Sequence, residues 1–239
     1  MTPDPTPDAT PDATPDSTPE LPPTPPPTLL LTGFEPFDGE AVNPSWAVAQ
    51  ALHGQMIGDA QVVAVQLPCV FATALPALQR ALAAYQPCWV LALGLAGSRS
   101  AISVERLAVN LVDARIADNA GAQPVDVPVE AAGPAAYFTG LPAKAIVARL
   151  QQAGLAAELS HSAGSFVCNQ VFYGLMHALA ATPQVVAGFI HLPPLPEQAA
   201  RHPTARPMAL ADQVKGLRWV IEAVVGGVAE LHTAAGRID

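Results

Sequence analysis

Short apolar runs alternate along the chain with stretches in which apolar residues recur every three or four positions. The runs, which are rich in Leu and Val, lie at residues 29–32, 62–67, 89–94 and 185–192. Apolar runs of this length predict buried strands. The periodic stretches predict helices at residues 45–52, 73–85, 143–153, 168–181 and 209–231. Asn43 followed by Pro44 marks one helix start, with Asn as the cap and Pro in the first turn.

This alternation of strands and helices predicts an α/β fold with a mostly parallel central sheet covered by helices on both faces. In open sheets of this kind, ligands bind outside the carboxyl ends of the strands. We therefore expect the segments that follow the apolar runs to face one crevice. These segments are GFEPF at residues 33–37, PCVF at 68–71, LAGSR at 95–99, and His191 at the end of the last run.

The start of the chain has a different composition. Residues 2–28 repeat Thr-Pro-Asp and then turn to polyproline, with no basic residue and almost no apolar one. Such a segment cannot bury enough surface to offset the entropy cost of ordering it. We expect residues 1–28 to be a disordered, acidic tail and residues 29–239 to be one folded domain.

Composition and charge narrow the class of protein. Of 239 residues, 51% are hydrophobic and 13% are charged, which suits one globular domain with a large core. The formal net charge of -9 argues against nucleic acid or an anionic membrane as the main partner. No apolar stretch approaches the ~20 residues of a membrane span. We expect a soluble, cytoplasmic protein.

The three cysteines form neither a CxxC pair nor a zinc-type spacing, so we expect no disulfide framework and no metal site. Cys168 follows a small, glycine-containing stretch and begins a predicted helix. A helix N-terminus favours a thiolate, which makes Cys168 a candidate nucleophile. The alternative is that it is a small buried apolar side chain, which describes Cys69 and Cys88 better.

A nucleophilic cysteine needs a base. His177 lies nine residues further along the same helix, roughly 13 Å away along the axis at 1.5 Å per residue, which is too far to share a proton. His191 ends a buried strand at the edge of the sheet where ligands are expected. The pattern leaves two interpretations of His191 open, a catalytic base and a buried core histidine.

Residues 94–124 gather charged groups in a chain that is otherwise poor in them. A carboxylate that orients the base could be Glu105, Asp113 or Asp118, and their spacing does not choose among them. The alternative is a surface cluster of ion pairs that includes Arg99, Arg106 and Arg115. The glycines do not spell a dinucleotide or phosphate-binding motif, so no nucleotide cofactor is indicated.

Five collinear segments are the most specific feature of the chain: LLTGFEPFDGEAVNPSWAVAQAL, ERLAVNLVDARIADNAGAQP, GPAAYFTGLPAKAI, SAGSFVCNQVFYGLMHAL and GFIHLPPLPEQ. Together they resemble the pyroglutamyl peptidase I family of cysteine peptidases, which remove N-terminal pyroglutamate. The resemblance extends from about residue 29 to at least residue 231. It implies a single α/β domain with a twisted central sheet, a fold shared with purine nucleoside phosphorylases, and commonly a homotetramer. It implies no metal or organic cofactor.

The resemblance also assigns catalytic roles. The family nucleophile falls on Cys168, its base on His191 and its orienting carboxylate on Glu105. The expected substrates are peptides with N-terminal pyroglutamate. This lactam is neutral, so its site needs apolar walls and a few amide hydrogen bonds rather than an acidic anchor.

The resemblance further implies that Phe34, Phe37 and Phe166 enclose the pyroglutamyl ring, that Asn43 supplies a polar contact, and that Arg115 lies near the catalytic groups. The chain departs from the common family pattern at four positions, where it has Leu95, Cys69, Pro194 and Ala117. None of these departures touches the three predicted catalytic residues.

Two other functions fit the same fold. A nucleoside-phosphorylase-like enzyme would need an anion site of Arg and backbone N–H groups and would not need Cys168. A non-catalytic homologue could bind pyroglutamyl peptides or capture a partner through the tail. The intact set of Cys168, His191 and Glu105 counts against the second alternative.

Overall fold

The computed structural model describes Met1 and residues 25–236, and within this part of the chain a seven-stranded sheet forms the centre of the domain. The strand order is β2-β3-β1-β4-β9-β5-β8. The strands are β1 (Thr28–Phe34), β2 (Met56–Ile57), β3 (Ala60–Leu67), β4 (Trp89–Leu95), β5 (Ile102–Glu105), β8 (Ala157–Ser160) and β9 (Val186–Leu192). A separate antiparallel pair joins β6 (Leu107–Val109) to β7 (Ala136–Phe138).

The sheet is mostly parallel, as the alternating pattern predicts. Strand β1 runs parallel to β3 and β4, β4 runs parallel to β9, and β5 runs parallel to β8. Two contacts are antiparallel, β2 with β3 and β5 with β9. Because β1, β3, β4 and β9 share one direction, their carboxyl ends meet at one edge of the sheet.

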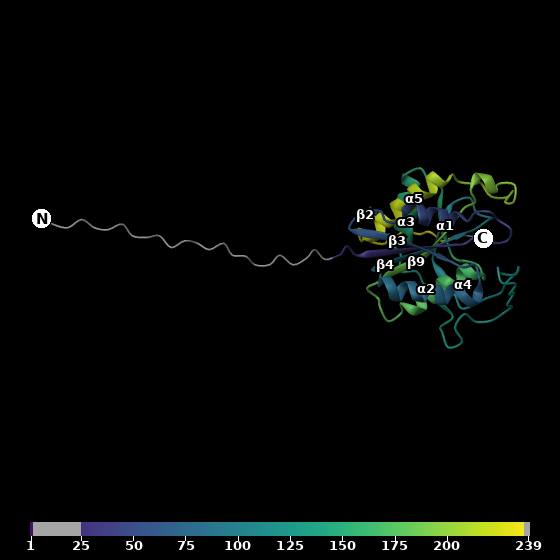
Figure 1. The fold of residues 1–239 in the computed structure, drawn as a ribbon. Helices are drawn as coiled ribbons and strands as arrows, with labels where there is room; N and C mark the ends of the chain where they lie inside the picture. Colours follow the sequence, from purple (N-terminus) through teal and green to yellow (C-terminus); the bar gives the residue numbers. More distant parts are fainter. Residues whose placement is uncertain (2–24, 237–239) are drawn as a thin grey trace.

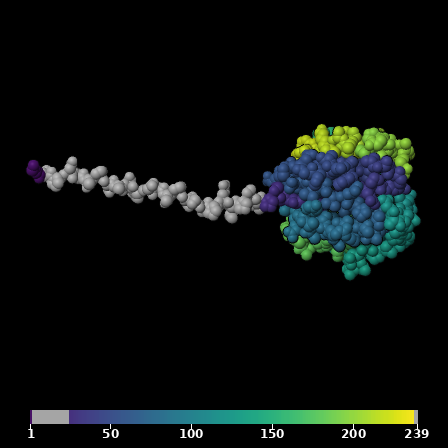
Figure 2. Space-filling model, in the orientation of Figure 1, coloured from purple at the N-terminus to yellow at the C-terminus, as the bar shows by residue number. Residues whose placement is uncertain are grey.

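Helices cover both faces of the sheet (Figure 1). Helices α1 (Pro44–Leu52), α3 (Ala143–Gln152) and α5 (Leu210–Val225) bury one face, and α2 (Phe71–Tyr85) and α4 (Val167–Ala178) bury the other. Two apolar clusters result, one on each face. In the space-filling view, the α5 segment runs along one edge of the domain in yellow (Figure 2).

All five predicted helices and all four predicted strands are present. The expected start of α1 is confirmed, because the Asn43 side chain accepts a hydrogen bond from the Ser45 N–H at 3.1 Å. The prediction for the last helix is wrong at its end, since α5 stops at Val225, before Gly226 and Gly227. Two adjacent glycines disfavour a helix enough to end it.

The apolar pattern does not reveal five strands, namely β2, β5, β6, β7 and β8. These strands have two to four residues each, and β5 and β8 each include a glutamate. Such segments lack the continuous apolar run that marks a buried strand. Their place in the fold depends on pairing with strands that are distant in sequence.

The tail was predicted to be disordered over residues 1–28. Of these, residues 2–24 lie outside the described part of the chain, and β1 begins at Thr28. None of the helices in the described part is both long enough and apolar enough to cross a membrane.

Candidate active site

The alternation of side chains along β9 aims His191 at the face covered by α2 and α4. Ile190 and Leu192 point to the opposite face, whereas Phe189 packs with α4. Since side chains in a strand alternate between faces, His191 lies on the same face as Phe189, and the two rings are 4.9 Å apart. His191 is 4% exposed and lies one residue before the end of the strand.

Glu105 reaches the same face from the neighbouring strand. In the antiparallel pairing of β5 with β9, Ser103 lies opposite His191, and Glu105 follows two residues later on the same side. The Glu105 carboxylate is fully buried, and its Oε1 atom lies 2.7 Å from Nδ1 of His191. This contact fixes the orientation of the imidazole ring and leaves its Nε2 edge for other partners.

Arg99 completes a charged group of three side chains. Its Nη1 atom donates to Glu105 Oε1 at 2.5 Å, and its Nη2 atom donates to the Ser162 carbonyl at 2.7 Å. Burial by itself would raise the pKa of Glu105. The hydrogen bond and charge of His191 and the charge of Arg99 outweigh burial, so the pKa of Glu105 is below its usual value and the carboxylate stays ionised.

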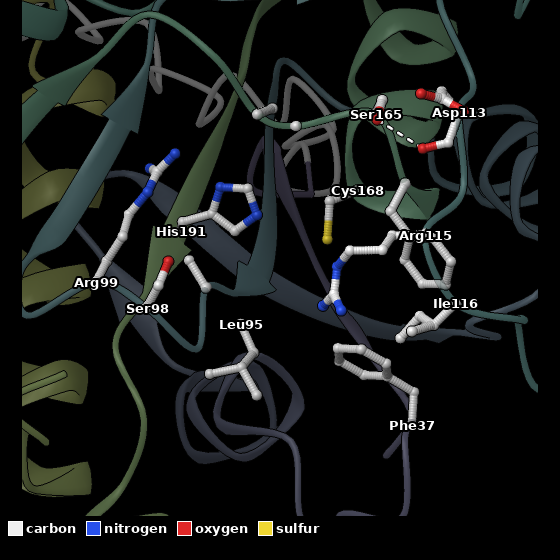
Figure 3. A pocket seen from close by; sticks show the side chains of 14 residues that line it. Phe37, Leu95, Ser98, Arg99, Asp113, Arg115, Ile116, Ser165, Cys168 and His191 are labelled. Carbon is white, nitrogen blue, oxygen red and sulfur yellow. Dashed lines mark hydrogen bonds between the residues drawn. The ribbon is translucent and has the colours of Figure 1, made fainter. Parts of the chain in front are cut away.

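Cys168 is the second residue of α4, and Gly94 allows its sulfur to approach the sheet. A Cβ at Gly94 would lie only 2.8 Å from the sulfur of Cys168, so a larger residue would displace it. Gly94 on β4 pairs directly with His191 on β9. The sulfur and the imidazole are therefore neighbours at the carboxyl edge of the sheet, as Figure 3 shows.

The surroundings of Cys168 affect the ionisation of its thiol. Burial raises its pKa well above the usual value, and the nearby Cys69 and Glu105 raise it further, whereas Arg99 lowers it by less. Burial thus opposes the thiolate that the helix start is expected to favour. A neighbouring base that takes the proton offsets this effect of burial.

Asn169 holds the first turn of α4 against the segment that follows β5. Its fully buried side chain accepts from the Val109 N–H at 3.0 Å and donates to the carbonyls of Val109 and Leu111, each at 2.9 Å. These contacts fix the helix that carries Cys168. No local sequence pattern predicts this role of Asn169, although the residue directly follows the candidate nucleophile.

A cavity of about 350 Å³ opens beside the cysteine and the histidine. Figure 3 shows Phe37 and Leu95 along one wall and the Arg115 side chain extending into the cavity toward Phe37. The Phe37 and Phe166 rings are 6.1 Å apart, and Phe71 packs edge-on against Phe166 at 5.1 Å. The site therefore has aromatic walls near the reactive pair, which suit a small, neutral ring.

The structure brings Cys168, His191, Phe37, Phe166 and Arg115 together around this cavity. Within the described residues, the Arg115 guanidinium makes no hydrogen bond or ion pair, so it is available to a ligand. Arg99, Asp113, Ile116 and Ser165 also line the cavity, although the sequence analysis assigns them no contact with a ligand. Only their position in the sequence could have identified them, because all four lie in or next to the segments at residues 94–124 and around Cys168.

Two predicted contact residues lie outside the lining of this cavity. Phe34 is 1% exposed and belongs to the apolar cluster beneath α2 and α4. Asn43 is buried, caps α1 and donates to the Glu35 carbonyl at 3.1 Å. In the free protein, both residues support the loop that carries Phe37.

The expected crevice is present, but only three of the four predicted segments line it. Residues 33–37, 95–99 and His191 supply lining residues, whereas residues 68–71 supply none to this cavity. Cys69 is buried, and burial together with the charges of Glu35 and Asp118 raises the pKa of its thiol to about 12. Of the other departures from the family pattern, Leu95 lines the cavity, Pro194 is buried and Ala117 is exposed.

The fold and the site together define a class. A cysteine at a helix start, next to a histidine that a buried carboxylate orients, is the arrangement of enzymes that use a thiol as nucleophile. Within the described residues, no group of three or more His, Cys, Asp or Glu side chains is placed to hold a metal ion. The arrangement of the cysteine, the histidine and the carboxylate defines the class as an enzyme of the α/β fold class that uses a cysteine nucleophile.

Comparison with known proteins gives the family. Residues 28–226 match the pyroglutamyl peptidase family. A pyrrolidone-carboxylate peptidase of Cupriavidus taiwanensis is 53% identical over 88% of this chain and 99% of its own length. The corresponding protein of Chromobacterium violaceum is 57% identical over 82% of this chain and 91% of its own length.

Solved structures agree with this assignment. The crystal structure of Bacillus amyloliquefaciens pyroglutamyl peptidase I superposes with a TM-score of 0.82 at 42% identity, covering 86% of this chain and all of that one. A mutant pyrrolidone carboxyl peptidase of Pyrococcus furiosus gives 0.81 at 40% identity over 84% of this chain and 99% of that chain. The chain belongs to the pyroglutamyl peptidase family, and it is a cysteine-type peptidase. Neither the phosphorylase alternative nor the non-catalytic one is supported.

Proposed function

We propose that this chain hydrolyses the bond after an N-terminal pyroglutamyl residue, with Cys168 as nucleophile, His191 as general base and acid, and Glu105 as the orienting carboxylate. The main support for these roles is the 2.7 Å contact between His191 Nδ1 and Glu105 Oε1. Cys168 lies beside this pair, because Gly94 has no side chain to block its sulfur. The contact turns Nε2 of His191 toward the cavity, where a proton acceptor is needed.

The first step is the activation of the thiol. Burial raises the pKa of the Cys168 thiol, so Nε2 of His191 takes the proton from the sulfur as the substrate enters. The resulting imidazolium donates its Nδ1–H to Glu105, whose ionised carboxylate stabilises the positive charge. Arg99 neutralises Glu105 in the resting state and keeps the carboxylate in place.

The thiolate then attacks the carbonyl carbon of the pyroglutamyl residue. The sulfur–carbon bond forms, the C–N bond to the next residue breaks, and the imidazolium of His191 gives its proton to the leaving amine. Water, deprotonated by His191, attacks the thioester, and pyroglutamate leaves as the thiol is restored. Backbone N–H groups at the start of α4 stabilise the oxyanion in both steps.

The pyroglutamyl ring lies against the cavity wall that Phe37 and Phe166 form, whose ring centroids are 6.1 Å apart. Arg115 extends into the cavity and contacts a carbonyl oxygen of the substrate. The contacts predicted for Phe34 and Asn43 remain predictions. In the free enzyme Phe34 lies behind this wall, and Asn43 holds the loop that carries it.

The test is the release of a chromophore from a pyroglutamyl amide by the wild type and by Cys168→Ser and His191→Ala variants. We expect both variants to lose at least about 1000-fold in kcat/KM, because each removes a group that acts in bond making or breaking. Cys88→Ser is the matched control, since Cys88 is exposed and lies away from the cavity. Full activity of Cys168→Ser would disprove the assignment of the nucleophile, and an inactive wild type would disprove the function.

We also propose that the enzyme is a cytoplasmic homotetramer, and that its catalytic domain spans residues 29–239 after a proline-rich tail. The family resemblance supports the tetramer, and three free cysteines are consistent with a reducing compartment. Sedimentation of the purified chain tests the assembly. A monomer at micromolar concentration would contradict it.

A further inference from the structure

A group of four side chains outside the cavity ties together two loops that border it. The first loop, residues 35–42, carries Phe37. The second, residues 193–209, follows β9 and includes a short 3-10 helix at Pro196–Gln198. The four side chains, which we call the loop clasp, are Glu40, Gln198, Arg201 and His202.

The centre of the loop clasp is the Glu40 carboxylate, whose side chain is only 7% exposed. Its Oε1 atom accepts from Arg201 Nε at 2.9 Å and from His202 Nε2 at 3.0 Å. Its Oε2 atom accepts from Gln198 Nε2 at 3.0 Å. A carboxylate that is nearly buried and accepts three hydrogen bonds holds its partners more firmly than a solvent-exposed ion pair does.

The loop clasp also makes hydrogen bonds to the backbone on both sides of Glu40. Gln198 donates to the Val42 carbonyl at 3.2 Å, and Arg201 donates to the Asp38 carbonyl. Asp38 directly follows Phe37. The position of the Phe37 ring in the cavity wall therefore depends on residues that themselves lie outside that wall.

His202 extends the clasp to a third segment. Its ring lies so close to Gly97 that a Cβ at this position would overlap it. Gly97 belongs to residues 95–99, which line the cavity through Leu95, Ala96, Ser98 and Arg99. His202 thus lies between the Phe37 loop and residues 95–99, and it contacts both.

We propose that the loop clasp holds Phe37 against the pyroglutamyl ring, and that Glu40 and His202 are positioning residues that set the affinity for this ring. The inference rests on the proposed function. The ring is in contact with Phe37 before and during the reaction, so the contact stabilises the ground state and the transition state alike. Loss of the clasp should then raise KM and leave kcat unchanged.

The experiment compares the wild type with His202→Ala and His202→Gln variants on the chromogenic pyroglutamyl amide. We expect His202→Ala to raise KM about fivefold or more with kcat within about twofold. His202→Gln retains an N–H that can reach Glu40 and should return KM to near the wild-type value. Hydrogen exchange of residues 35–42 should be faster in His202→Ala than in the wild type and normal in His202→Gln.

Arg149→Ala is the matched control, because it breaks a partly exposed ion pair with Glu222 between α3 and α5, away from the cavity. It should change neither KM nor exchange in residues 35–42. An unchanged KM in a folded His202→Ala variant, or a fall in kcat alone, would overturn the positioning role. If the wild type released no chromophore, the proposed function would fail, whereas unchanged exchange in residues 35–42 would refute the clasp itself.

Discussion

Glu105 is fully buried and negatively charged, and its two charged or polar partners explain how the charge is stabilised. Arg99 and His191 both contact its Oε1 atom, so the carboxylate is stabilised as an ion although burial opposes ionisation. Sequence reasoning left three carboxylates open as the orienting group. Only the antiparallel register of β5 with β9 brings Glu105, and not Asp113 or Asp118, to the histidine.

A Glu105→Gln variant should lose stability in a pH-dependent way. The folded pKa of Glu105 is lower than the ordinary value of 4.5, so ionisation stabilises the wild type above that pH, and this contribution is lost as the pH falls through the folded pKa. At neutral pH we expect the variant to unfold with a free energy about 2–4 kcal/mol smaller than that of the wild type.

Urea unfolding of both proteins over a pH series measures this difference. The difference in the free energy of unfolding between wild type and variant should decrease steadily as the pH falls below 4.5. A constant gap across the series would mean that the effect of the substitution is steric and that the ionised carboxylate does not contribute.

At the scale of elements, strand β4 and helix α4 together position Cys168, the proposed nucleophile. The glycine in WVLALGL leaves room for the sulfur at the point where β4 pairs with β9. A Cβ at Gly94 would lie 2.8 Å from Cys168 Sγ and 2.9 Å from Phe189 Cζ. We expect Gly94→Ala to lower kcat/KM about 100-fold, since small displacements of a reacting atom are costly.

Kinetics of Gly94→Ala together with its thermal midpoint separate a misplaced sulfur from an unfolded protein. Gly236→Ala is a suitable control, because a Cβ at Gly236 meets no atom within 4 Å. Wild-type kcat/KM in Gly94→Ala would show that the strand does not constrain the nucleophile.

The C-terminal segment supplies a cap for a helix that lacks its own. The N-cap residue of α3, Pro142, makes no side-chain hydrogen bond, and the carboxylate of Glu230 accepts instead from the N–H groups of Lys144 and Ala145 at 3.0 and 3.1 Å. This contact is possible because α5 ends early and the chain turns back. The continuous helix predicted to residue 231 would have prevented it.

Replacing Glu230 with Ala should reduce the free energy of unfolding by about 1 kcal/mol, which is typical for the loss of a helix cap. Activity should stay at the wild-type level, since Glu230 does not line the active-site cavity. Equilibrium unfolding and the chromogenic assay measure the two quantities. Equal stability of the variant and the wild type would show that water replaces the cap without cost.

At the scale of the whole molecule, the proline-rich start of the chain lies outside the family match, which begins at residue 28. Its composition offers almost no apolar side chain to the core. We expect deletion of residues 2–27 to leave kcat and KM within about twofold of the full chain. The same assay, run on both proteins at equal concentration, tests this expectation, and a larger loss would reveal a role for the tail.

Local patterns were sufficient for much of this protein. The apolar runs located β1, β3, β4 and β9, the periodic stretches located all five helices, and the family segments indicated the catalytic residues. Short segments such as ISVE and AELS were not recognisable as strands, because too few residues carry the pattern. The roles of Arg99 and Asn169 were not predictable for a different reason, because their partners lie far away in the sequence or on other elements.

The sequence by itself determined the fold class and the edge of the sheet where the site would form, because both follow from local periodicity and from residue types at strand ends. The family resemblance added Cys168 and His191 as the predicted nucleophile and base. Only the tertiary structure decided the effect of burial on the pKa of Cys168, the pairing of Glu105 with Arg99, and the contacts of Glu40 in the loop clasp. Each depends on burial and on contacts between segments far apart in the chain, which no local pattern encodes.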